Sequence, residues 1–148
     1  MKISSRDFVD SIMSFVDVPW RLHGRNRNGV DCAGLAVLAY RECGGEIGDR
    51  MDYDARMPDP KKLVDIVQAA CEPYTQHQMG PGKLLLTRWG SSPYPRHVCL
   101  TVDDGMIVHC DAKLRRVVCQ PVALISRDIV GAFSFREVNY GDCKPWPV

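Results

Sequence analysis

The stretch Asn28-Gly29-Val30-Asp31-Cys32-Ala33-Gly34-Leu35 is the most informative part of this sequence. It predicts a turn-rich loop that leads directly into a helix, because Asp31 is a good N-cap residue and an apolar run follows it. Cys32 then lies in the first turn of that helix. A helix N-terminus carries partial positive charge and favours a thiolate over a thiol, so the position suits a reactive cysteine.

Two histidines further along the chain join Cys32 as candidate catalytic residues. His97 and His109 fall in strand-like runs on either side of a turn. An imidazole can take the proton of a thiol and later return it to a leaving amine. Taken singly, Cys32 is equally well explained as a buried structural cysteine, and His109 is better explained as a half-buried structural histidine than as a catalytic one. The combination favours nucleophilic catalysis.

The length of the turn between the histidines decides whether they share a face of the hairpin. A two-residue loop, Asp104-Gly105, would place them on opposite faces. A three-residue loop over 103–105, with Gly105 in the left-handed conformation, pairs Cys99 with His109. One face is then wholly apolar, formed by Val98, Leu100, Val102, Met106, Val108 and Cys110. Because a one-residue slip moves every side chain to the other face, we predict the three-residue loop and both histidines on the second face.

The pattern of the whole chain predicts an α+β fold. Helices are expected from Ser5 to the residues before Pro19, over 33–42 and over 60–71. Strands are expected at 83–89, 97–102, 106–110, 115–119 and 130–135. N-terminal helices followed by these strands predict helices packed on a roughly five-stranded antiparallel sheet. Residues 1–138 are expected to form a single domain, and residues 139–148 a loose C-terminal tail.

Composition argues against several classes of partner. The formal net charge of +1 gives no reason to expect binding to nucleic acid. No apolar run reaches the about 20 residues that span a bilayer, so no membrane span is expected. Residues 1–10 lack the features of a secretory signal peptide, which predicts synthesis in the cytoplasm.

The seven cysteines include no CxxC pair, so a zinc ribbon or a redox motif is not expected. A zinc site built on His97, Cys99 and His109 is an alternative. The predicted register turns Cys110 away from these three, and structural zinc sites have four ligands. We therefore expect no metal and no cofactor.

These motifs resemble the NlpC-type cysteine peptidases, the NlpC/P60 family of bacterial and phage cell-wall hydrolases. The resemblance rests on Pro19-Trp20, on the stretch from Gly29 to Leu35, and on His97-Val98 followed by Ile107-Val108-His109. It covers roughly residues 5–136. Residues 19–24, 81–86 and 129–135 are similar to single-domain cell-wall peptidases of phages and phage-like elements.

The resemblance implies a papain-like fold, with Cys32 as nucleophile, His97 as base and His109 as the residue that orients His97. Members of the family cleave amide bonds in peptidoglycan stem peptides, commonly between γ-D-glutamate and a diamino acid. In phages the domain is carried at the tail tip. The expected partners are therefore a peptidoglycan stem peptide and phage tail-tip proteins, with a virion-associated protein acting on the cell wall.

The loop before Cys32 is expected to contribute to substrate binding through Trp20, Arg21, His23 and Asp31, because arginines bind carboxylates well. A solvated basic loop is the alternative. Three positions depart from the family pattern: Ala33 replaces a serine, Trp20 replaces the commoner tyrosine, and Lys83 replaces an aspartate. The first two put the usual specificity in doubt, and the third is expected to affect only a turn.

Two other functions stay open at this point. One is a structural tail-assembly module with little activity. The other is a papain-like acyltransferase or a hydrolase of small amides.

Overall fold

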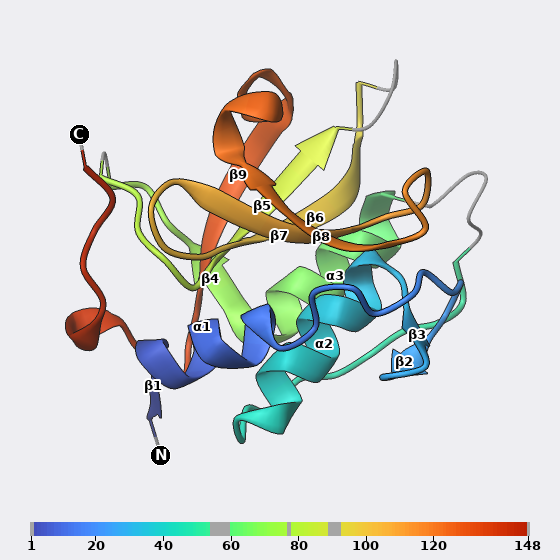
Figure 1. Cartoon of the computed structure of the whole chain (residues 1–148), viewed down its shortest axis with the longest axis horizontal. Coiled ribbons are helices and arrows are strands. Elements are labelled where there is room, and N and C mark those ends of the chain that lie inside the picture. Colours follow the sequence, from blue (N-terminus) through green and yellow to red (C-terminus); the bar gives the residue numbers. More distant parts are fainter. Residues whose placement is uncertain (1, 54–59, 77, 89–92, 148) are drawn as a thin grey trace.

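The computed structural model describes residues 2–53, 60–76, 78–88 and 93–147. Three helices lie against one face of a curved sheet (Figure 1). The helices are α1 (Ser5–Met13), α2 (Cys32–Glu42) and α3 (Pro60–Ala70). Among the described residues, no helix has the length and apolar character that crossing a membrane requires.

The sheet has six strands in the order β4-β9-β5-β6-β7-β8, and all neighbours are antiparallel. The predicted α+β class is therefore confirmed. The strands are β4 (Cys71–Pro73), β5 (Lys83–Arg88), β6 (Pro95–Thr101), β7 (Met106–Asp111), β8 (Arg116–Pro121) and β9 (Ile129–Phe135). Position 89, the predicted end of the first long strand, lies outside the described residues.

The smallest elements escaped prediction. Strand β4 follows α3 without a break, so its first residue, Cys71, was assigned to the helix. Two-residue strands were missed as well, because so short a run has no readable period. They are the parallel pair β1 (Ile3–Ser4) and β10 (Val138–Asn139), and the antiparallel pair β2 (Arg25–Asn26) and β3 (Gly29–Val30). Short 3₁₀ turns occupy Val122–Leu124, Ser126–Asp128 and Tyr140–Asp142.

Helix α1 begins as predicted and ends early. The hydroxyl of Ser4 accepts a hydrogen bond from the backbone N–H of Asp7, which makes Ser4 the N-cap. After Met13 the amides of Phe15 and Val16 bond three residues back, which tightens the chain into a turn. Asp17 then takes a φ of 76° and redirects the backbone. Phe15 stays in the core although it lies beyond the helix.

The main core lies between the helices and the sheet. Helix α2 is buried nearly all round, as its apolar sequence predicts. The ring of Phe8 packs edge-on against Phe135 with centroids 4.8 Å apart, and against Tyr40 at 5.6 Å. A smaller apolar cluster covers the other face of the sheet, where Cys99 and Ile107 are fully buried.

The hairpin of β6 and β7 has the predicted register. Leu100 pairs with Val108 and Thr101 with Ile107. The amide of Val102 donates to the carbonyl of Met106 at 2.9 Å, which closes a three-residue loop. Gly105 takes a φ of 74°, as this loop requires. His97 and His109 therefore project from one face.

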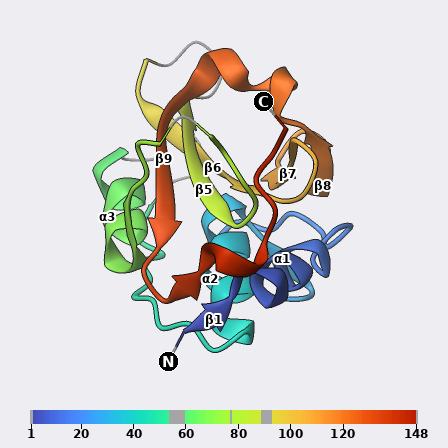
Figure 2. The same ribbon diagram turned by 90° about the vertical axis from the view of Figure 1, so that its left-hand side faces the viewer.

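The C-terminal residues are anchored, so the expectation of a loose tail is wrong. The hydroxyl of Tyr140 donates to the carbonyl of Gly82 at 2.8 Å. Further on, the indole N–H of Trp146 donates to the carbonyl of Val102 at 2.6 Å. Figure 2 shows the segment running from the turn after β10 along the molecule to the C-terminus.

We predict that Phe8→Ala lowers the free energy of unfolding by about 3–5 kcal/mol, because it leaves a cavity between two aromatic neighbours. Urea denaturation measures the change. Met13→Ala is the control, since Met13 lies on the same helix and is 42% exposed. An equal loss of stability in the two variants would contradict the packing described here.

Candidate functional site

The start of α2 meets the open end of the β6–β7 hairpin. The described ladder between these strands stops at the Leu100–Val108 pair, whereas β7 and β8 pair along their whole length. Helix α2 contacts both β6 and β7. The backbone amide of Val98 lies near the thiol of Cys32, the first residue of α2, and lowers its pKa. Cys32 is thereby placed against the residue that follows His97.

The carboxylate of Asp31 holds the start of α2, and each of its acceptor positions receives a hydrogen bond. Its Oδ1 accepts from the backbone N–H of Gly34 at 2.8 Å and from Arg25 Nη1 at 2.9 Å. Its Oδ2 accepts from the backbone N–H of His23 at 2.9 Å and from the Tyr53 hydroxyl. A carboxylate has about four lone-pair positions, so the buried Asp31 is saturated.

Arg25 extends this network into the chain after α2. Its Nε donates to Asp49 at 2.7 Å, and its Nη2 donates to the Tyr53 hydroxyl at 2.9 Å. The ring of His23 lies edge-on to Tyr53, and its Nε2 is 2.6 Å from the Tyr53 carbonyl oxygen. Two segments far apart in sequence thus fix the helix that carries Cys32.

Steric crowding explains why position 34 of the Asp31-Cys32-Ala33-Gly34 motif is a glycine. A Cβ atom at Gly34 would lie 2.3 Å from the carbonyl oxygen of Gly24 and 2.7 Å from Arg25 Nη1. The loop before the helix therefore packs directly on the first turn of α2. A side chain at this position would push that loop away from Asp31.

The two histidines form a hydrogen-bonded series with Gln120 on β8. His97 Nε2 lies 2.8 Å from His109 Nδ1, and His109 Nε2 lies 2.8 Å from Gln120 Oε1. An amide oxygen only accepts, so His109 carries its proton on Nε2 and presents a lone pair at Nδ1. His97 then donates from Nε2, which leaves the lone pair on its Nδ1. In this tautomer His97 can act as a base.

Gln120 did not emerge from the sequence. The predicted strand ended one residue earlier, at 119, and no expected register connected it with the histidines. In the structure Gln120 pairs with Ile107, so it shares the face of His109. The signal was the alternation of Val118 and Gln120 with Val117 and Cys119, which face the main core. This alternation has meaning only once the β7–β8 register is known.

Burial controls the charges at the site. It raises the pKa of the Cys32 thiol to about 12, and the neighbouring Asp31 carboxylate raises it further. The amides of Val98 and Ala33 offset only part of this rise. Burial, together with His109, lowers the pKa of His97 to about 3. The resting site therefore holds a neutral thiol and a neutral imidazole, and the thiolate expected from the helix N-terminus is not the favoured form.

A second thiol lies even deeper among the histidines. Cys99 Sγ and one ring nitrogen each of His97 and His109 lie within 4.8 Å of one another. Cys99 is 0% exposed, whereas Cys32 is partly exposed. Of these two cysteines, Cys32 is the one that keeps some exposed surface.

Trp20 and Arg21 flank the start of α2. Trp20 is half-buried and bridges to Val30 in the parallel sense, and the guanidinium of Arg115 lies 5.9 Å from its ring centroid. Arg21 is exposed, and its backbone amide donates to the Val30 carbonyl at 2.9 Å. The role of Trp20, Arg21, His23 and Asp31 as substrate contacts stays a prediction. For His23 and Asp31 the geometry shows contacts within the protein.

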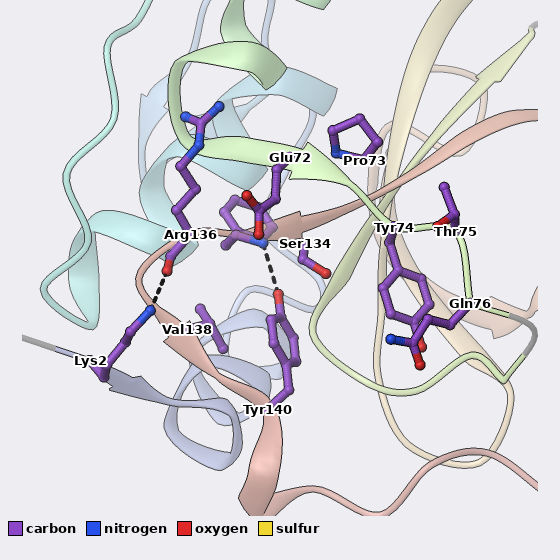
Figure 3. A pocket seen from close by; sticks show the side chains of 11 residues that line it. Lys2, Glu72, Pro73, Tyr74, Thr75, Gln76, Ser134, Arg136, Val138 and Tyr140 are labelled. Carbon is purple, nitrogen blue, oxygen red and sulfur yellow. Dashed lines mark hydrogen bonds between the residues drawn. The ribbon is translucent and has the colours of Figure 1, made fainter.

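Lys83 does more than shape a turn. Its buried ammonium lies 3.4 Å from the ring centroid of Tyr140 and 3.9 Å from that of Tyr74, and it donates to Ser134 Oγ at 2.9 Å. Burial lowers the pKa of Lys83 to about 8. The three partners of Lys83 line a hollow of about 330 Å³ (Figure 3). None of the candidate site residues lines this hollow.

We predict that ¹⁵N NMR of the histidine rings finds the Nε2–H tautomer at both His97 and His109, because Gln120 Oε1 accepts from His109. Gln120→Leu should mix the two tautomers of each ring. Gln76→Leu is the control, since Gln76 is exposed and follows β4, the strand at the opposite edge of the sheet from β8. An Nδ1–H tautomer at His97 in the unmodified protein would contradict the proposed direction of the series.

We also predict that Cys32 contributes no thiolate absorbance near 240 nm between about pH 5 and about pH 9, because burial raises its pKa. Thiolate forms only as the pH rises toward the raised pKa. The difference spectrum between the unmodified protein and Cys32→Ala isolates this thiol from the other six. Excess absorbance at about pH 6 would instead reveal a preformed thiolate–imidazolium pair.

The NlpC/P60 family pattern matches residues 17–127 of this chain. A search of curated proteins finds no match. Solved structures with the same fold include the NlpC/p60 domain of the peptidoglycan hydrolase SagA, with 20% identity and a TM-score of 0.63. That match covers 88% of this chain and 98% of the SagA domain.

Two further structures share the fold. The peptidoglycan hydrolase RipB from Mycobacterium tuberculosis is 20% identical with a TM-score of 0.62, over 92% of this chain and 67% of RipB. An NlpC/P60 family protein from Bacillus cereus is 18% identical with a TM-score of 0.70, over 94% of this chain. The present chain spans only 42% of that longer protein.

The family match covers most of the chain, from the residues before Trp20 to those beyond Gln120, and includes Cys32, His97 and His109. The structural likenesses agree with it in fold. This chain belongs to the NlpC/P60 family of cysteine peptidases.

Proposed function

We propose that the protein is a cysteine peptidase that hydrolyses amide bonds in peptidoglycan stem peptides, with Cys32 as nucleophile, His97 as base and His109 as the residue that orients His97. The observation that carries the proposal is the His97–His109–Gln120 series, which leaves a lone pair on Nδ1 of His97, the residue before Val98, whose backbone amide lies near the Cys32 thiol. Family membership supports a cell-wall peptidase or amidase at the coarser level.

Cys32 is a better candidate nucleophile than Cys99 for two reasons. The Cys32 residue is partly exposed, so a substrate can approach it, whereas Cys99 is fully buried. It also lies at a helix N-terminus, where backbone N–H groups can stabilise the oxyanion of a tetrahedral intermediate. Cys99 lies in the middle of β6, where the strand uses its backbone groups for pairing.

In the proposed reaction the Cys32 sulfur attacks the amide carbon while its proton moves to His97 Nδ1. The tetrahedral intermediate collapses when the carbon–nitrogen bond breaks and His97 returns this proton to the leaving amine. Water then attacks the thioester, with His97 again accepting a proton, and releases the carboxylic acid and the Cys32 thiol. Since burial lowers the pKa of His97, proton transfer is expected to accompany attack rather than precede it.

We propose the bond between γ-D-glutamate and the diamino acid as the scissile bond, as in similar family members. Stem peptides carry several carboxylates. Exposed Arg21 and Arg115 flank Trp20 next to the start of α2, and they provide matching positive charge. Ala33 is buried and offers no hydroxyl, so substrate holding would depend more strongly on these arginines.

We also propose that the protein acts as a virion component, associated with the tail of a phage or prophage, made in the cytoplasm and delivered to the cell wall. This finer proposal rests on the similarity of residues 19–24, 81–86 and 129–135 to phage-type members. Immunodetection in purified tails is its direct test.

The test of the enzymatic proposal is hydrolysis of the stem tetrapeptide L-Ala-γ-D-Glu-diaminopimelate-D-Ala, followed by mass spectrometry. We expect cleavage by the unmodified protein and loss of at least about 10³-fold in activity for Cys32→Ala, because the covalent route is removed. Cys119→Ala is the matched control, a half-buried thiol on β8 away from the histidine face, and should retain cleavage.

Each contrary result points elsewhere. Loss of cleavage in Cys99→Ala with retention in Cys32→Ala would move the nucleophile to Cys99. A Cys32 that reacts with iodoacetamide in a protein that cleaves no stem peptide would favour a different acyl substrate, as in an acyltransferase. An unreactive Cys32 without cleavage would favour the structural tail module.

A further inference from the structure

We propose that His97, Cys99 and His109 form a zinc-binding site through which zinc inhibits the enzyme. The inhibitory consequence rests on the proposed function, whereas the binding of zinc does not. The site consists of three donor atoms on one face of a single hairpin, with the residues 6%, 0% and 1% exposed.

The donors have the right chemistry and spacing. Imidazole nitrogen and thiolate sulfur are preferred zinc ligands, at about 2.0–2.1 Å and about 2.3 Å from the metal. The three candidate atoms lie within 4.8 Å of one another. The nitrogens of His97 and His109 are 2.8 Å apart, and a tetrahedral ion between them needs a separation of about 3.3 Å. A small rotation of either ring supplies the difference.

Gln120 already holds His109 in the form that a metal requires. Ligating histidines donate their other ring N–H to a neighbouring oxygen, which fixes the tautomer and the ring plane. His109 Nε2 makes this bond with Gln120 Oε1 at 2.8 Å, and its Nδ1 lone pair faces His97. The support usually found around a bound zinc ion is therefore present beside one of the three ligands.

Binding would disable His97 through its tautomer. Zinc takes the place of the proton between His97 Nε2 and His109 Nδ1, the thiol proton of Cys99 is released, and the ring proton of His97 moves to Nδ1. His97 Nδ1 then has no lone pair with which to accept the proton of Cys32. No electron transfer is involved, and the fourth coordination position goes to water, so a fourth protein ligand, absent from the sequence pattern, is not needed.

Cobalt(II) is a suitable probe, because thiolate-bound tetrahedral cobalt absorbs strongly. We expect the Cys32→Ala variant, which lacks the catalytic thiol, to show a near-ultraviolet thiolate-to-cobalt band and intense visible bands. These should disappear in Cys32→Ala/Cys99→Ser and persist in Cys32→Ala/Cys110→Ser. Cys110 is the matched control, since it is an equally buried thiol on the opposite face of the same hairpin.

Zinc inhibition gives the second measurement. With each protein compared with its own metal-free activity, Cys99→Ser should raise the zinc concentration for half-inhibition about tenfold or more. Absence of the cobalt bands in Cys32→Ala, or bands that survive Cys99→Ser, would overturn the site. Equal zinc sensitivity in the unmodified protein and in Cys99→Ser would assign the metal to Cys32 and His97 alone. Circular dichroism establishes that each variant is folded, and the cobalt result stands even for a protein that cleaves no stem peptide.

Discussion

The buried carboxylate of Asp31 is the constraint on which the nucleophile's side of the site depends. It caps α2 at the residue before Cys32 and accepts from Arg25, whose guanidinium is in turn held by Asp49. Removing one partner of a buried ion pair costs about 3–5 kcal/mol, because the remaining charge is left uncompensated. The position of the thiol is therefore secured by charges that never contact it directly, and by a loop that folds back from beyond the helix.

The base side of the site is built separately, from three adjacent strands. β6 contributes His97, β7 contributes His109 and β8 contributes Gln120. Their order along the sheet makes them neighbours, and the accepting oxygen of Gln120 sets the direction of the hydrogen bonds. The two halves meet where the amide of Val98 approaches the Cys32 thiol. A small domain can thus position a nucleophile and a base with independent structural supports.

The sequence was sufficient for the features that depend on periodic burial. The apolar face of the 97–110 hairpin selected the loop length, and with it the common face of the histidines. The cap of α2 and its all-round burial were equally readable. Features that depend on long-range partners could not be read from the sequence. Arg25, Asp49 and Tyr53 look like ordinary polar loop residues until the fold brings them to Asp31. The pKa of Cys32 was misjudged because the helix N-terminus is visible in a sequence and desolvation is not.

The anchoring of the C-terminal segment has a practical consequence for how the protein can be handled. Trp146 donates to the carbonyl of Val102, at the base of the loop that joins the two histidine strands. Its own backbone amide is bonded to Met79, just before the central strand β5. The last residues are therefore a brace on the hairpin rather than an appendage. A purification tag or a fusion partner is better attached at the N-terminus. Trimming the chain at residue 138 would remove both contacts of Trp146 and alter the hairpin.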